Sequence, residues 1–393
     1  MEQMRFDLGN PQEEAPKRIQ KRRMPRKLKI LAAVIVLVLA VVAAFILLDR
    51  TAFDGLRRSV IYAGADKDAA GCATLYRYGG DTGSRFAALD GSLVVASPGS
   101  LTLLDEKGNV RYQTGLKFSN ADVRARDGWA LVYDIGGTEI YLLHAGGLAA
   151  QLTMEGEIYS AEVGAGGTFA VVYSKTGYKS AVCVYNSKGE LLYEFYSADR
   201  YLLDAAVSED GKYMACAAMS QADGSFISSV EIFRLTREEQ QAACQVTGGV
   251  YEMVGLSGRF CVATENALNY VKMDGKVASY DYEGGYLRRA ALTGDGYGAL
   301  LLGNYQSGGQ TRLVTVNTAG EEIASMETEG EVLSLSAAGR YTAVLYSDRL
   351  VIYDRNLKEC AALEEASSAR VVLMRADGSA VLAGNAAASL YLP

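Results

Sequence analysis

The feature that most constrains the fold is a unit of about 41 residues that recurs along most of the chain. Each unit contains a glycine followed by a solidly apolar stretch, and then a second apolar stretch that mostly ends at Asp or Asn near a glycine. The leading glycines are Gly91, Gly128, Gly167, Gly211, Gly258, Gly296, Gly339 and Gly378, with spacings of 37 to 47 residues. Short apolar runs bounded by turn residues are typical of strands that are covered on both faces.

Four strands in each unit and a period near 40 residues predict an all-β fold, an eight-bladed β-propeller. The predicted second strands of the units are 92–97, 129–134, 169–174, 213–219, 260–264, 298–304, 341–347 and 380–385. A seven-bladed propeller with an extra hairpin is the alternative.

The last unit stops at Pro393 after three strands, and a strand-like stretch at 72–80 precedes the first unit. Pairing of 72–80 with residues 388–393 would supply the missing fourth strand and cover two sheet edges. We therefore expect a propeller domain over 72–393 that is closed by its N-terminal strand.

A second feature is an apolar run at 30–48, 19 residues without a charged or polar side chain. A helix of this length just spans the hydrocarbon core of a bilayer. Eight basic residues at 17–29 precede it, so the positive-inside rule places the N-terminus in the cytoplasm and the propeller outside. A cleaved signal peptide is the alternative, because Val42–Ala44 resembles a small-residue cleavage site.

These segments predict a single-pass protein of the cell membrane. Its parts are a basic cytoplasmic tail (1–29), a transmembrane α-helix in the lipid bilayer (30–48), a juxtamembrane connector (49–71) and the extracytoplasmic propeller. The tail has a net charge of +5 and the rest of the chain a net charge of −12. An acidic body is unsuited to nucleic acid, which requires a basic surface, so we expect no nucleic-acid partner.

The sequence offers few residues for catalysis. His144 is the only histidine, and it occupies the turn position that Asp or Asn fills in other units. We therefore interpret it as a turn residue. The stretch GAGGTF (164–169) resembles part of a dinucleotide fingerprint, but a strand follows it instead of a helix, so we predict turn glycines and no cofactor.

The six cysteines lie at least 17 residues apart, so they form no CxxC metal or redox pair. Cys183, Cys216 and Cys261 fall within apolar strands and are expected to be core thiols. Cys72 and Cys360 fall on predicted outer strands of neighbouring blades, where a disulfide is an open alternative.

Two kinds of residue could serve a binding or catalytic surface. Acidic stretches such as 154–157 and 326–331 could supply the paired carboxylates of a glycoside hydrolase, although solvated charges are the simpler interpretation. Tyrosines are concentrated at 185–202 and 279–289, and tyrosine is favoured at binding surfaces.

The longer loops are expected between second and third strands, as at 220–229 and 304–311. With the channel mouth, these loops are where we expect binding, because propeller function lies in the loops. No catalytic, cofactor-binding or metal-binding residue is assigned.

A basic N-terminus, one apolar helix, the segment LRRSVIYAG (56–64) and the propeller repeat resemble an uncharacterised bacterial membrane-anchored family, domain of unknown function 5711. The family lies within the quinoprotein-like and WD40-like propellers. The resemblance implies a cell-envelope protein and supplies no active-site residue. With one Trp and one His, the chain lacks the recurrent Gly-His and Trp-Asp pairs of WD40 repeats and the repeated Trp docking motifs of quinone-binding propellers.

The predicted function is a non-enzymatic docking or ligand-binding module in the cell envelope, with an envelope protein or a glycan as partner. The alternative is an envelope enzyme, either a hydrolase that uses paired carboxylates or a cofactor-bound oxidoreductase. Carboxylates or His144 converging in the central channel would favour the enzyme.

Overall fold

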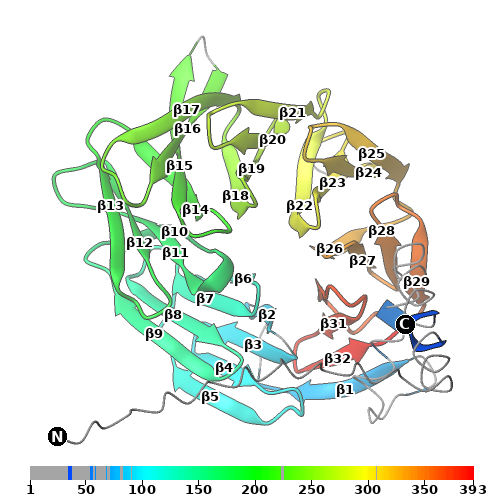
Figure 1. The fold of residues 1–393 in the computed structure, drawn as a ribbon. Coiled ribbons are helices and arrows are strands. Elements are labelled where there is room, and N and C mark those ends of the chain that lie inside the picture. The colour runs from blue at the N-terminus through cyan, green and yellow to red at the C-terminus, as the bar shows by residue number, and fades with distance from the viewer. Residues whose placement is uncertain are drawn as a thin grey trace, which may run out of the picture. The chain divides into compact units, whose positions relative to one another are not determined.

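The computed structural model describes residues 34–37, 54–55, 58, 68, 71–79, 83–89, 91–222, 225–306 and 308–393. The chain divides into two compact units, Met1–Asp54 and Gly55–Pro393. The second unit contains eight four-stranded antiparallel sheets, which form blades around a central channel (Figure 1). The predicted all-β, eight-bladed propeller is confirmed, and the seven-bladed alternative is wrong.

Each blade is a meander of an innermost, a second, a third and an outermost strand. The strands from β2 to β29 form blades 1 to 7 in chain order, four strands to a blade. Blade 8 combines β30, β31 and β32 with β1. The innermost strands are β2 (Arg85–Leu89), β6 (Ala121–Arg126), β10 (Ile158–Val163), β14 (Tyr201–Val207), β18 (Val250–Leu256), β22 (Tyr286–Gly294), β26 (Val332–Ala338) and β30 (Val371–Met374). The second strands are β3 (Ser92–Ser97), β7 (Trp129–Asp134), β11 (Phe169–Tyr173), β15 (Tyr213–Ala222), β19 (Arg259–Thr264), β23 (Tyr297–Gly303), β27 (Tyr341–Tyr346) and β31 (Ala380–Ala383).

The third strands are β4 (Ser100–Leu104), β8 (Glu139–His144), β12 (Ser180–Tyr185), β16 (Ser225–Arg234), β20 (Ala267–Lys272), β24 (Thr311–Asn317), β28 (Leu350–Asp354) and β32 (Ala387–Tyr391). The outermost strands are β5 (Val110–Gly115), β9 (Gly147–Thr153), β13 (Leu191–Ser197), β17 (Gln240–Thr247), β21 (Val277–Asp281), β25 (Glu322–Glu327), β29 (Glu359–Leu363) and β1 (Cys72–Arg77). A short 3-10 helix, η1 (Ala165–Gly167), precedes β11.

The hydrophobic core lies between neighbouring blades. Second strands such as β3, β11 and β27 are buried at every position, because a blade packs against each of their faces. Outermost strands such as β5 and β21 alternate between more and less exposed positions, since one face of each remains in solvent. This difference explains why only the second and third strands are solidly apolar in the sequence.

Strand β1 completes blade 8 by pairing with β32, with Cys72 opposite Tyr391 and Arg77 opposite Ala387. The fully buried Tyr76 links this blade to blade 1, because its hydroxyl donates a 2.6 Å hydrogen bond to the carbonyl of Gly91. The ring is therefore closed by the first strand of the propeller, which is the pairing that the three-stranded last unit suggests.

Arg58, in the predicted connector, also contacts blade 8. Its Nη1 donates to the carbonyl of Asp377 at 2.6 Å, and its Nη2 donates to the carbonyl of Pro393 at 3.3 Å. Arg58, which precedes the propeller in the sequence, is thus attached at the blade that closes the ring.

One expected loop is a strand extension instead. The sequence predicts a loop at 220–229, but β15 and β16 continue as paired strands, with Gln221 opposite Phe226 and Ala222 opposite Ser225. The sequence between them, Asp-Gly, is typical of a two-residue hairpin turn, which lets pairing continue to the tip. The loop expected at 304–311 is present between β23 and β24.

Most of the predicted N-terminal segments lie outside the described residues. These are the tail (1–29), the transmembrane helix (30–48) apart from 34–37, and much of the connector (49–71). Residues 34–37 are helical with exposed apolar side chains. Among the described residues, no helix has the length and apolar character needed to cross a membrane.

Candidate functional site

His144 is a turn residue at the end of β8, as predicted. Its Nδ1 accepts a hydrogen bond from the backbone N–H of Gly146 at 2.9 Å. Its ring meets the indole of Trp129 edge-on, with centroids 5.2 Å apart. The first contact closes the turn and the second packs it against β7, so the structure gives His144 a packing role.

The glycine-rich stretch at 164–169 forms a tight turn, also as predicted. Gly166 and Gly167 have φ values of +71° and +77° and lie in η1, and strand β11 follows. A Cβ atom on Gly167 would lie 2.6 Å from the Trp129 ring. These glycines therefore serve the turn and its packing against blade 2.

All six cysteines are free thiols. Cys183, Cys216 and Cys261 are buried, which confirms the prediction of core thiols. Burial raises the pKa of all three, and that of Cys183 to about 11. Cys72 and Cys360 lie on the outermost strands of blades 8 and 7, but no disulfide joins them.

The acidic stretch at 154–157 lies in the connection between β9 and β10, and the stretch at 326–331 runs from the end of β25 into the connection to β26; the acidic side chains of both are exposed. The Glu155 carboxylate accepts hydrogen bonds from Lys175 and Tyr173, and these bonds lower its pKa. Glu329 is 3.7 Å from the guanidinium of Arg349. These acids behave as solvated surface charges with basic neighbours, and not as a catalytic pair.

The channel holds a cluster that the sequence analysis did not single out. Three carboxylates from the innermost strands of blades 2, 3 and 5 surround the guanidinium of Arg124. Its Nε lies 3.2 Å from Asp122 and 3.8 Å from Glu162, and its Nη1 lies 3.4 Å from Glu252. Asp122 also accepts a 2.9 Å hydrogen bond from the Tyr133 hydroxyl.

A fourth carboxylate, Asp204 on β14, joins blades 3, 4 and 5. It accepts hydrogen bonds from the Ser160 hydroxyl and from the backbone N–H groups of Ala205 and Met253, the last two at 2.9 Å. The innermost strands of blades 3 to 7 each contain a β-bulge that is followed by a polar residue, among them Asp204 and Glu252, but the apolar pattern of the sequence does not reveal these bulges.

Burial dominates the electrostatics of this cluster. It raises the pKa values of Glu162, Asp204 and Glu252, and the positive charge of Arg124 opposes each shift. Burial alone would lower the pKa of Arg124, but Glu162, Glu252 and Asp122 outweigh it, so the guanidinium remains charged.

Carboxylates therefore do converge in the channel, as an enzyme would require. Their oxygens, however, are engaged by Arg124 and by backbone amides of neighbouring blades, an arrangement that joins blades. In the part of the chain that the structure describes, no three or more His, Cys, Asp or Glu side chains are placed to hold a metal ion.

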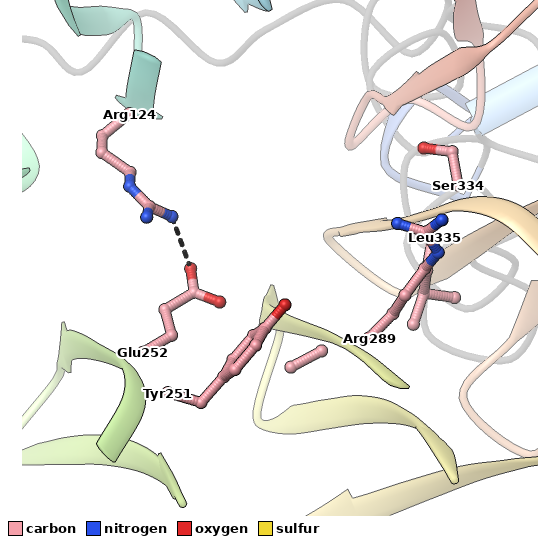
Figure 2. Close-up of a pocket in the computed structure, with 7 residues that line it drawn as sticks. Arg124, Tyr251, Glu252, Arg289, Ser334 and Leu335 are labelled. Carbon is pink, nitrogen blue, oxygen red and sulfur yellow. Dashed lines mark hydrogen bonds and ion pairs between the residues drawn. The ribbon is translucent and has the colours of Figure 1, made fainter. Parts of the chain in front are cut away.

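A cavity of about 470 Å³ lies beside this cluster in the central channel (Figure 2). It is lined by residues from the innermost strands of blades 2, 5, 6 and 7, namely Arg124, Tyr251, Glu252, Arg289, Ala290, Ser334 and Leu335. Figure 2 shows the Arg124–Glu252 pair on one side, Arg289 and Ser334 on the other, and Tyr251 between them. The lining holds two guanidinium groups and one carboxylate. Arg124 is also paired with Asp122 and Glu162, whereas Arg289 has no such partner among the described residues.

A second cavity, of about 690 Å³, lies between blades 6 and 7, beside the loop that joins β23 to β24 in blade 6. Arg288 fixes this loop by donating hydrogen bonds to the carbonyls of Tyr305 (2.8 Å), Gln306 (2.5 Å) and Gly308 (3.0 Å). Arg289 lines both cavities. Channel and loop, the two places where binding is expected from the sequence, are therefore adjacent.

Exposed tyrosines gather on one side of the propeller, which we call the tyrosine face. This is the side where innermost strands begin and second strands end. All six tyrosines that are exposed among the described residues lie there, in blades 3 to 6: Tyr159, Tyr178, Tyr201, Tyr251, Tyr286 and Tyr305. Of the two predicted tyrosine-rich stretches, 185–202 contributes Tyr201 and 279–289 contributes Tyr286.

The fold and channel define the class: this is an eight-bladed, WD40-like β-propeller. Residues 76–374 match the family of unknown function DUF5711, and because they make up most of the chain, the protein belongs to that family. No curated protein matches the sequence.

Similar solved structures are propeller proteins of low sequence identity. The C-terminal WD40 domain of Sif2 is 13% identical, with a TM-score of 0.59 over 82% of this chain and 98% of that one. The dihydro-heme d1 dehydrogenase NirN is 17% identical, with a TM-score of 0.51 over 76% and 72%. A eukaryotic initiation factor is 14% identical, with a TM-score of 0.51 over 77% and 81%. At these identities the likeness shows the fold alone.

Proposed function

We propose that the protein is a non-enzymatic binding module of the bacterial cell envelope, and that its tyrosine face is the docking surface. The observation that carries the proposal is the gathering of the exposed tyrosines on one side of blades 3 to 6. Tyrosine provides a large rigid contact area with a polar tip, and it is enriched where proteins bind partners. The partner is an envelope protein or a glycan.

Features other than the tyrosines themselves also fit a binding surface. Lys179 lies over the ring of Tyr201 at 5.2 Å, a contact that orients the ring in solvent. The two cavities described above share blades 5 and 6 with this surface. Rigid strands thus hold the ring of Tyr251 in the lining of the channel cavity, an arrangement that suits binding.

We further propose that residues 30–48 anchor the chain in the cell membrane, with the N-terminus in the cytoplasm and the propeller outside. The apolar run and the basic residues before it support this topology. Protease is added to cells whose wall has been removed but whose membrane is unbroken. It should digest the propeller and leave an epitope at the N-terminus intact. Digestion of that epitope, or release of the protein into the soluble fraction, would overturn the proposal.

Site-specific photocrosslinking in cells tests the docking surface. A photoreactive amino acid replaces Tyr251 or Tyr305 in the full-length protein, and replaces Val277 as the matched control. Val277 is also exposed but begins β21, at the opposite edge of the blades. We expect reproducible adducts from Tyr251 and Tyr305 and none from Val277. Equal adducts at all three positions, or none at the tyrosines, would refute the docking surface.

A further inference from the structure

We propose that the channel cavity binds an acidic saccharide, with Arg289 pairing with a sugar carboxylate and Tyr251 stacking against the sugar ring. This inference rests on the proposed function, because Tyr251 belongs both to the tyrosine face and to the cavity lining. It adds a chemical class of ligand and the residues that would recognise it.

Arg289 is the first ground for the inference. Its Nε donates one long hydrogen bond, 3.4 Å, to the carbonyl of Val332. No carboxylate of the described residues forms an ion pair with it, whereas Arg124 on the far side of the cavity has three carboxylates around it. Arg289 is also exposed, and in Figure 2 it lies on the same side of the cavity as Ser334. The cavity thus holds a cation whose charge is available to a ligand.

The identity of the cation favours a carboxylate. A guanidinium presents a planar fork of N–H donors that matches both oxygens of a carboxylate. The Ser334 hydroxyl accepts a 3.2 Å hydrogen bond from the N–H of Val372, so its own proton remains to be donated to a ligand oxygen. Glu252, the one acid of the lining, is paired with Arg124 and is placed to accept from ligand hydroxyls.

The rest of the surface favours a saccharide over a peptide. Tyr251 is 58% exposed and offers a flat ring with a hydroxyl, a surface on which the C–H face of a sugar stacks. The exposed large hydrophobic side chains of the tyrosine face are tyrosines, joined only by Ile135 among the described residues. A peptide anchor requires an apolar pocket, and this lining is mainly polar. The cavity volume of about 470 Å³ lies within the range of small-ligand sites.

Calorimetry with the purified full-length protein in detergent tests the inference. The probe is tetragalacturonate, and its fully methyl-esterified form, which has the same rings without charge, is the matched ligand. Arg289→Gln should weaken binding of the acid by about 10- to 100-fold. Lys188→Gln, which removes one charge from an exposed turn at the opposite edge, should leave it unchanged. Raising the salt concentration should weaken binding of the acid and not of the ester.

Two further variants separate recognition from folding. Tyr251→Ala should weaken both saccharides, and Arg289→Lys should recover only part of the affinity, since an ammonium lacks the bidentate fork. Arg289→Gln should unfold at the wild-type temperature, because the side chain makes one long hydrogen bond.

Three results would overturn the inference: no binding of tetragalacturonate, equal binding of acid and ester, or unchanged affinity in Arg289→Gln. Tighter binding of an acetylated tetraglutamate peptide than of the saccharide would replace it with an acidic-peptide site. Crosslinks at Tyr305 would still support the docking surface in each case, so the two proposals fail separately.

Discussion

Replacing Arg124 by glutamine should destabilise the propeller by about 2–3 kcal/mol at neutral pH. The substitution leaves Asp122, Glu162 and Glu252 without their shared cation, while only 10% of the Glu162 side chain and 21% of the Glu252 side chain are exposed. Breaking a fully buried ion pair costs about 3–5 kcal/mol. We expect less here because 36% of the Arg124 side chain is exposed, which lets water screen part of the charge.

The loss should depend on pH. The pKa values of Glu162 and Glu252 are raised in the folded protein above the ordinary glutamate value of 4.5. Between that value and the raised pKa, the folded state binds more protons than the unfolded state, so stability falls as pH rises through this window. Removing Arg124 raises these pKa values further, so the window widens and the total loss of stability across it is larger. The variant should therefore recover part of its stability at pH 5 relative to pH 7.5.

Urea unfolding of the full-length protein, followed by the fluorescence of Trp129, measures this. Trp129 is the only tryptophan, and its strand β7 pairs with the strand that carries Arg124. Arg111→Gln is the control, because that side chain is 58% exposed and forms only a 3.8 Å surface pair with Asp105. It should change stability by less than about 0.5 kcal/mol. Wild-type stability in Arg124→Gln, or a loss that is the same at both pH values, would refute the reasoning.

Three other perturbations test the fold. Gly320→Ala should cost about 2 kcal/mol or more in urea unfolding, because φ is +77° and a Cβ would lie 2.8 Å from the backbone of the neighbouring blade. Gly136→Ala is the control: φ is +82° but the space around it is open, so it should cost only about 1 kcal/mol. Equal losses would show that the close approach is absent. Tyr76→Phe should cost about 1–2 kcal/mol, since it removes the hydrogen bond between blades 8 and 1, and an unchanged midpoint would contradict that closure. With a thiol reagent at pH 8, the exposed Cys360 should react in the native protein and the fully buried Cys216 only after unfolding; early labelling of Cys216 would show that blade 4 opens.

The sequence predicts the fold well because the repeated feature is also the buried one. Strands such as 92–97 and 129–134 are apolar on both faces, since each is packed between two blades, and a glycine turn marks where each begins. Ring closure follows from the three strands of the last unit. The extended hairpin at 220–229 was misjudged because polar residues in a protruding hairpin resemble those of a loop.

The channel cluster could not be predicted in the same way. Arg124 and Glu252 are 128 residues apart, and each looks like an ordinary charged residue in its own unit. They meet only because a closed ring brings the innermost strands of non-adjacent blades to one channel. The bulges that set the direction of Glu252 and Arg289 each depend on one extra residue in the strand, which the apolar pattern does not reveal.

The closure by β1 has a mechanical consequence. The chain that leads into the propeller enters directly through β1, and β1 is held to the ring by five residue pairs with β32 and by the Tyr76 hydroxyl. Every other outermost strand is joined to its blade by a short turn of the chain as well. Tension applied through the N-terminal segment therefore loads blade 8 before any other blade, in a direction set by one strand. If the ring yields to force, it yields at this seam, and the remaining seven blades keep their pairing.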